Sequence, residues 1–115
     1  MNAGDSIVMN TSCLDVLGMP GMTVYSASKA ALRSATRTLS AELGDKNIRV
    51  NAVAPGPIET PIYGKFGMSE EQLGEMASDI VSQVPAGQFG TPDEIAGAVV
   101  FLASGASSYV RVLRE

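Results

Sequence analysis

Three residues of this 115-residue chain, Ser12, Tyr25 and Lys29, are of types that could together carry out chemistry at a carbonyl group. A tyrosine and a lysine four residues apart share one face of a helix, with Cβ atoms about 5–6 Å apart. A free phenol titrates near pH 10, and a neighbouring positive charge favours the phenolate, which suits a tyrosine acting as acid and base. Ser12 could add a hydroxyl donor aimed at the same oxygen. The combination predicts carbonyl reduction or alcohol oxidation, provided that a hydride carrier is present.

The elements that must position these residues follow a strand–helix–strand pattern. Residues Ser6 to Thr11 and Ile48 to Val53 are predicted strands, and the apolar run Ile7 to Met9 is typical of a parallel strand covered on both faces. The helix Tyr25–Leu43 between them would make a right-handed βαβ crossover. Gly44 is predicted to end that helix, as glycine commonly does.

Two further helices are predicted from their start signals. Ser69 precedes two glutamates and a glutamine, an arrangement that favours a helix N-terminus. The segment Thr91-Pro92-Asp93-Glu94 supplies an N-cap, a proline at the first helical position and acidic residues behind it. The helix that follows Thr91 is predicted to have a buried stripe, made by Ile95, Val99 and Leu102.

Five motifs, in this order and spacing, carry a resemblance to a known family: Ser6 to Ser12, Tyr25 to Lys29, Asn47 to Thr60, Gly90 to Ala96, and Phe101 to Ser104. Together they resemble the C-terminal half of the short-chain dehydrogenase/reductase family. The resemblance runs from about Gly4 to Val110, nearly the whole chain. It implies an α/β fold, the C-terminal part of a Rossmann-like doubly wound parallel sheet without the N-terminal nucleotide-binding strands. Residues 1–115 would then be a single partial domain, with a substrate lid at 61–88.

The resemblance also implies a role for each candidate residue. Tyr25 resembles the catalytic acid/base, and Lys29 resembles the residue that assists it and holds the nicotinamide ribose. Ser12 resembles the residue that orients and polarises the substrate carbonyl. The implied activity is that of an NAD(P)-dependent oxidoreductase, in which the cofactor supplies the hydride and the protein supplies orientation and the proton.

The cofactor contacts implied by the resemblance extend into the segment after the second strand. The turn Pro55-Gly56, with Ile58 and Thr60, resembles the segment that packs on the nicotinamide and binds its carboxamide. The cofactor is NAD or NADP. The implied partners are a small-molecule carbonyl or alcohol substrate and, through the Tyr25–Leu43 helix, a second copy of the intact enzyme.

The sequence also departs from the family pattern. The glycine-rich phosphate-binding motif of the family is absent, and with it the position that selects NAD or NADP. Arg111 stands where the family usually has a threonine, so a truncated clone, an interrupted gene or a misread frame are open explanations for this tail. We therefore keep an alternative: a catalytically inactive fragment that serves at most as an assembly or interaction piece.

Composition excludes several other classes of function. With 8 basic and 12 acidic residues the net charge is −4, which argues against a nucleic-acid surface. The absence of histidine rules out a Ser-His-Asp triad and argues against a zinc site. Ser26 to Lys29 fits the Ser-x-x-Lys pattern of penicillin-binding enzymes, but the companion Ser-Asp-Asn and Lys-Thr-Gly motifs are missing. No apolar run approaches the roughly 20 residues that span a bilayer, and no secretory signal is visible, so we expect a cytoplasmic protein without membrane partners.

Overall fold

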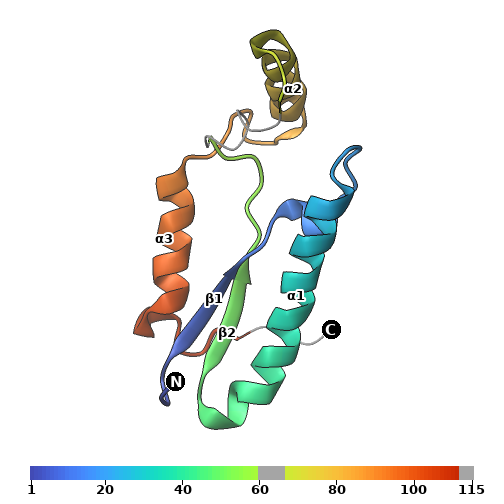
Figure 1. Ribbon diagram of the computed structural model, residues 1–115. Coiled ribbons are helices and arrows are strands. Elements are labelled where there is room, and N and C mark those ends of the chain that lie inside the picture. Colours follow the sequence, from blue (N-terminus) through green and yellow to red (C-terminus); the bar gives the residue numbers. More distant parts are fainter. Residues whose placement is uncertain (60–66, 112–115) are drawn as a thin grey trace. The chain divides into compact units, whose positions relative to one another are not determined.

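The computed structural model describes residues 1–59 and 67–111 (Figure 1). These residues form two compact units, each described here by itself. The first comprises Met1–Gly56 together with the chain from Ala96, and the second comprises Pro57–Ile95. Thr60 and the beginning of the predicted lid at 61–88 lie outside the described residues.

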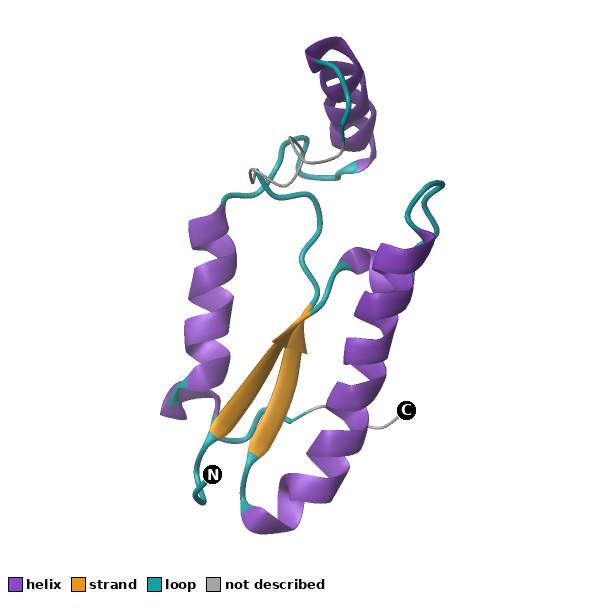
Figure 2. Ribbon diagram, in the orientation of Figure 1, coloured by secondary structure: helices purple, strands orange, loops and turns teal. Residues whose placement is uncertain are grey.

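The first unit is built on two parallel strands, β1 (Ser6–Asn10) and β2 (Arg49–Val53), joined through helix α1 (Thr23–Leu43) (Figure 2). Ser6 lies opposite Arg49 at one end of the pair, and the last pair at the other end is Asn10 with Val53. The predicted strand–helix–strand unit with parallel strands is confirmed. Its hydrophobic core is small: among the described residues only Ile48 and Val50 are fully buried apolar side chains. The apolar residues of β1 are half-buried, because that strand has a neighbour on one side only within the described chain.

Helix α1 packs on the sheet through the face that carries Thr36, a side chain only 2% exposed. A hydroxyl can be buried there because Thr36 Oγ1 donates to the carbonyl oxygen of Leu32, 2.7 Å away. The helix ends at Leu43 with Gly44 as its C-cap, as predicted, but Gly44 does not take the left-handed conformation common at that position. Gly44 keeps a helical backbone (φ −62°) and opens a short 3-10 helix, η2 (Gly44–Lys46). The left-handed residue is Asn47 (φ 55°), a residue type that tolerates this conformation.

The second unit contains helix α2 (Glu70–Gln83), which begins where the sequence predicts. Ser69 Oγ accepts the backbone N–H of Gln72, and the Gln72 side chain in turn accepts the backbone N–H of Ser69. This reciprocal capping box satisfies two donors that a helix N-terminus leaves free. Elsewhere in this unit Ile58 and Gly90 form an isolated parallel bridge.

Helix α3 (Pro92–Ala103) also begins as predicted, because Thr91 and Glu94 cap it by the same reciprocal bonds. The stripe predicted to be buried is only half-buried at Ile95, Val99 and Leu102. Two large apolar side chains of α3, Val100 and Phe101, are 65% and 46% exposed. The described chain therefore leaves part of the apolar surface of α3 uncovered. Within the part of the chain that the structure describes, no helix has both the length and the apolar character needed to cross a membrane.

Within the first unit, the end of α3 is held to β2 by Arg49, a buried arginine at the start of that strand. Its guanidinium nitrogens donate to the carbonyl oxygens of Leu102 and Ser107 at 3.2 and 2.8 Å. They also reach the Ser107 hydroxyl at 2.8 Å and the Ser104 carbonyl oxygen at 3.0 Å. The last carbonyls of a helix lack partners within the helix and carry partial negative charge. They therefore solvate the buried cation in place of a carboxylate.

Replacing Arg49 by glutamine should lower the free energy of unfolding by about 2–3 kcal/mol, because the carbonyl oxygens of Leu102, Ser104 and Ser107 would each lose a charged donor. Urea denaturation followed by circular dichroism measures this difference. Arg37→Gln is the matched control, since Arg37 is exposed on α1 and its loss should change stability by less than about 0.5 kcal/mol. Equal stabilities of the two variants would show that the Arg49 cluster does not hold α3.

Candidate active site

Ser12 lies just beyond the end of β1, in a backbone that continues to pair with the chain after β2. The N–H of Thr11 donates to the carbonyl oxygen of Val53 at 2.8 Å, and the N–H of Cys13 donates to that of Pro55 at 3.0 Å. Ser12 itself has an extended backbone (φ −160°, ψ 155°) and is 8% exposed. The two cross-strand bonds on either side fix its position relative to the Pro55 turn.

The hydroxyl of Ser12 is oriented by a helix cap. Ser12 precedes the short 3-10 helix η1 (Cys13–Asp15), and its Oγ accepts the N–H of Leu14 at 3.2 Å. Because the oxygen is used as an acceptor, the hydroxyl hydrogen is left to donate elsewhere. The Ser12 hydroxyl is thus held in position by Leu14, and its hydrogen has no acceptor in the part of the chain that the structure describes.

Tyr25 and Lys29 lie in the first two turns of α1, which packs against η1 and both strands. The Lys29 ammonium lies 5.6 Å from the centroid of the Tyr25 ring, so the two side chains share one face as predicted. Lys29 Nζ also donates to the carbonyl oxygen of Asn10 at 3.1 Å. This bond ties the ammonium to the end of β1, two residues before Ser12. Both Tyr25 and Lys29 are half-buried, and the Tyr25 hydroxyl bonds to no described residue.

The predicted cofactor segment divides between described and undescribed parts. Pro55 is half-buried and Gly56 exposed, both in the first unit with Ser12, Tyr25 and Lys29. Ile58 belongs to the second unit, where it pairs with Gly90. Thr60 lies outside the described residues. The structure therefore brings together Ser12, Tyr25, Lys29 and the Pro55 turn, and leaves the rest of the segment a prediction.

Ser12, Tyr25 and Lys29 together offer two hydroxyl donors beside one cation. An ammonium held at half-exposure can donate to sugar hydroxyls while it stabilises a phenolate, so the residues fit a nicotinamide nucleoside. Among residues 1–59 and 67–111, no cluster of three or more histidine, cysteine or acidic side chains could hold a metal ion. Sequence reasoning missed Asn10 and Leu14, because both act through backbone atoms that carry no residue signature.

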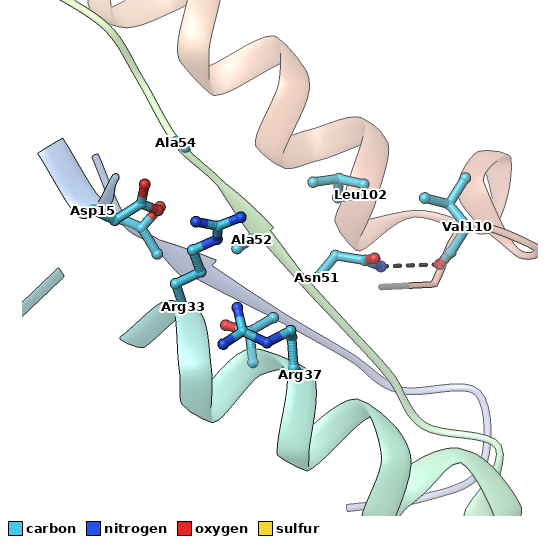
Figure 3. A pocket seen from close by; sticks show the side chains of 10 residues that line it. Asp15, Arg33, Arg37, Asn51, Ala52, Ala54, Leu102 and Val110 are labelled. Carbon is cyan, nitrogen blue, oxygen red and sulfur yellow. Dashed lines mark hydrogen bonds between the residues drawn. The ribbon is translucent and has the colours of Figure 1, made fainter. Parts of the chain in front are cut away.

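A separate pocket of about 680 Å³ lies in the first unit, lined by side chains of Asp15, Arg33, Arg37 and Asn51 among others (Figure 3). Arg33 and Arg37 come from neighbouring turns of α1, and Asn51 Nδ2 donates across the pocket wall to the Val110 carbonyl at 2.9 Å. Neither Tyr25 nor Lys29 lines this pocket. We therefore do not assign it to the candidate active site.

Residues 1–112 match the model of a protein family described as enoyl-(acyl carrier protein) reductase. The chain is 49% identical over 105 residues to the 3-oxoacyl-[acyl-carrier-protein] reductase of Thermotoga maritima, covering 91% of this chain and 40% of the relative. It is 43% identical over 105 residues to the reductase of the same name from Chlamydia muridarum, with the same coverage. The chain thus spans about 40% of the length of these curated relatives.

Solved structures of similar fold support the relationship found by sequence. A candidate NAD(P)-dependent gluconate 5-dehydrogenase from Beutenbergia cavernae, which holds NADP at low occupancy, is 37% identical, with a TM-score of 0.83 over 92% of this chain and 41% of that one. A short chain dehydrogenase family protein from Francisella tularensis is 30% identical, with a TM-score of 0.83 over 96% of this chain and 48% of that one. The fold is therefore part of a Rossmann-like α/β sheet. The chain belongs to the short-chain dehydrogenase/reductase family.

Replacing Ser12 by alanine should lower the free energy of unfolding by about 1 kcal/mol, because the N–H of Leu14 loses its capping acceptor. The amide of Leu14 should also exchange with solvent faster, which NMR measures directly. Ser28→Ala is the control: its exposed hydroxyl donates only to the Tyr25 carbonyl within its own helix, and its loss should cost less than about 0.5 kcal/mol. Unchanged exchange at Leu14 in the Ser12 variant would contradict the cap.

Proposed function

We propose that the protein is an NAD(P)-dependent oxidoreductase that transfers hydride between a nicotinamide and a carbonyl or alcohol substrate. The observation that carries the proposal is the placement of the Lys29 ammonium, 5.6 Å from the Tyr25 ring and bonded to the end of β1 beside Ser12. Two hydroxyl groups whose hydrogens have no acceptor among the described residues, and one cation beside them, are the set that carbonyl reduction needs. Membership of the family supports the same reaction.

Three residues divide the work on the substrate. The Ser12 hydroxyl, held as an acceptor by Leu14, donates its hydrogen to the substrate oxygen and polarises the carbonyl. The Tyr25 phenol delivers a proton to that oxygen, and the Lys29 ammonium stabilises the phenolate that remains. Oxidation of an alcohol is the same sequence in reverse. The nicotinamide, when bound, supplies or accepts the hydride.

Binding of the cofactor is proposed for residues on both sides of the Pro55 turn. Lys29 donates to the ribose hydroxyls, and Pro55 and Gly56 pack on the nicotinamide ring. Ile58 and Thr60 complete this contact. The support comes from the bond that fixes the Pro55 carbonyl to Cys13, beside Ser12, and from the NADP held by the Beutenbergia cavernae structure. Both NAD and NADP remain within the proposal.

The substrate class is a carbonyl/alcohol pair, with no single compound assigned. The similar proteins carry names that refer to different substrates: enoyl and 3-oxoacyl groups on an acyl carrier protein, and gluconate. The 3-oxoacyl name recurs in the relatives quoted above, which makes a 3-oxoacyl thioester the first probe to use.

Domain organisation and assembly are proposed on the same basis. The two compact units belong to one partial domain, residues 1–115, in which residues 61–88 form the lid over the substrate. In the intact enzyme a homo-oligomer forms through α1, whose exposed face carries small residues, among them Ala27, Ala31 and Ser34. A chain that stays monomeric in sedimentation velocity when mixed with intact subunits would contradict this contact.

A second candidate is a catalytically inactive piece that acts at most in assembly. The observations that favour it are the coverage of only 40% of the relatives' length and the absence of the glycine-rich phosphate-binding motif. A nucleotide bound to residues 1–115 alone would lack the helix N-terminus that usually faces its pyrophosphate.

Binding of the reduced cofactor separates the two candidates. The oxidoreductase predicts a saturable change in NADPH or NADH fluorescence on adding the folded protein, and a weakening of about tenfold or more in Lys29→Met, because the ribose loses a charged donor. Lys46→Met is the control, since Lys46 lies in η2 at the other end of α1. A folded protein, checked by circular dichroism, that binds neither cofactor would favour the inactive piece.

Replacing Tyr25 by phenylalanine removes the proton donor and keeps the ring. Turnover of an acetoacetyl thioester with NADPH should fall by about a thousandfold, while the dissociation constant for NADPH should change less than about threefold. Tyr109→Phe is the control, because Tyr109 is 95% exposed and its change should leave turnover intact. Undiminished turnover in the Tyr25 variant would refute the assigned acid.

A further inference from the structure

We propose that Thr11 is a positioning residue for catalysis: its side chain clamps the end of β1 to the chain after β2 and so holds the Ser12 hydroxyl in register with the Pro55 turn. The proposal rests on the function proposed above for Ser12. It adds a residue that does not touch substrate or cofactor and acts through its neighbour.

The clamp consists of two hydrogen bonds to a single carbonyl. The backbone N–H of Thr11 donates to the carbonyl oxygen of Val53 at 2.8 Å. The Thr11 hydroxyl donates to the same oxygen at 3.0 Å. A carbonyl oxygen has two lone pairs, so both bonds can be made together. Thr11 is 4% exposed, and it also lines the pocket of about 680 Å³ described above.

The clamp lies just past the end of the β1–β2 ladder and next to Ser12. Asn10 and Val53 form the last pair of the two-stranded ladder, so the chain beyond them would fray first. Ser12 lies between the Thr11 clamp and the bond from the Cys13 N–H to Pro55, the residue proposed to face the nicotinamide. Of the bonds that fix the Ser12 backbone across the strands, the Thr11 hydroxyl supplies the one made by a side chain. It is therefore the bond that a substitution can remove.

The local cap on Ser12 does not by itself fix its hydroxyl relative to the Pro55 turn. The Ser12 hydroxyl is aimed by its bond from Leu14, but that bond lies within the same short segment and moves with it. The direction of Ser12 relative to the Pro55 turn depends on the cross-strand bonds. When the Thr11 hydroxyl is lost, the segment keeps its local cap and loses part of its anchorage to β2. Transition-state alignment suffers more than cofactor binding, because alignment depends on both segments at once.

Thr11→Val tests the clamp, because valine keeps the shape and removes only the hydroxyl. Thr11→Ser restores a hydroxyl and serves as the rescue. Thr36→Val is the matched control: Thr36 is also buried and also donates one side-chain bond to a backbone carbonyl, but within α1. Amide exchange of the protein is followed by NMR in all three variants and in the parent.

In Thr11→Val the amides of Cys13 and Leu14 should exchange about 3–10-fold faster, the range that the loss of one hydrogen bond gives. The amide of Val50, in the buried part of β2, should keep its rate. Thr11→Ser should return the Cys13 and Leu14 amides to the parent rates, and Thr36→Val should leave them unchanged. Parent-like exchange at Cys13 and Leu14 in Thr11→Val would overturn the clamp, as would acceleration that spreads equally to Val50.

Kinetics with NADPH and the acetoacetyl thioester test the consequence for catalysis. Thr11→Val should lower kcat about 3–10-fold with KM for NADPH unchanged within twofold, and Thr11→Ser should recover kcat. If Thr11→Val merely lowered the amount of folded protein, the Val50 amide would also exchange faster. An unchanged rate at Val50 therefore separates the positioning role from a loss of stability. If Tyr25→Phe is inactive and Thr11→Val is fully active, the positioning role of Thr11 is refuted and the proposed function stands. If Tyr25→Phe is fully active, the proposed function fails, and the exchange rates still decide whether the clamp exists.

Discussion

The structure depends on the parallel pairing of β1 with β2 and on its continuation past the ends of both strands. Within the ladder the pairing buries Val50, and beyond it the bonds from Thr11 to Val53 and from Cys13 to Pro55 carry the register forward. Parallel strands bring their carboxyl ends to the same edge of a sheet, which is where ligands bind in open α/β sheets. One interaction thereby stabilises the small core and places Ser12 beside the Pro55 turn.

Charge is arranged differently at the two ends of this sheet. At the amino end, Arg49 is buried and donates to backbone carbonyls at and just after the end of α3, an arrangement that joins β2 to this part of the chain. At the carboxyl end, Lys29 is half-buried and makes one bond to the Asn10 carbonyl. An ammonium has three hydrogens, so donors remain for other groups. The first cation makes four hydrogen bonds to the protein, whereas the second makes one and keeps hydrogens for a ligand.

The features that the sequence predicts well are those set by local chemistry. Ser69 and Thr91 cap helices through side chains three residues from their partners, and Tyr25 and Lys29 meet because helical geometry brings residues four apart together. Gly44 shows the limit of this reasoning. The turn continues by a 3-10 step, and the left-handed conformation falls on Asn47 instead.

The contacts that the sequence could not predict are long-range or made by backbone atoms. The Arg49 cluster joins residues more than fifty positions apart, and nothing in the local sequence marks its partners. The exposure of Val100 and Phe101 on α3 follows from which surfaces the described chain provides, and residue pattern alone does not report this. Asn10 and Leu14 contribute to the site through a carbonyl and an amide that every residue possesses.

We propose that Ser12 and Tyr25 act on one and the same substrate oxygen. A crystal structure of the protein with NADP and a 3-hydroxyacyl thioester tests it most directly. In that complex a ligand oxygen should lie within hydrogen-bond reach, about 2.6–3.2 Å, of both Ser12 Oγ and the Tyr25 hydroxyl oxygen, with Lys29 Nζ at the ribose. A ligand whose hydroxyl contacts neither residue, or a Tyr25 side chain directed away from Ser12 in the complex, would show that the two residues do not share a substrate oxygen.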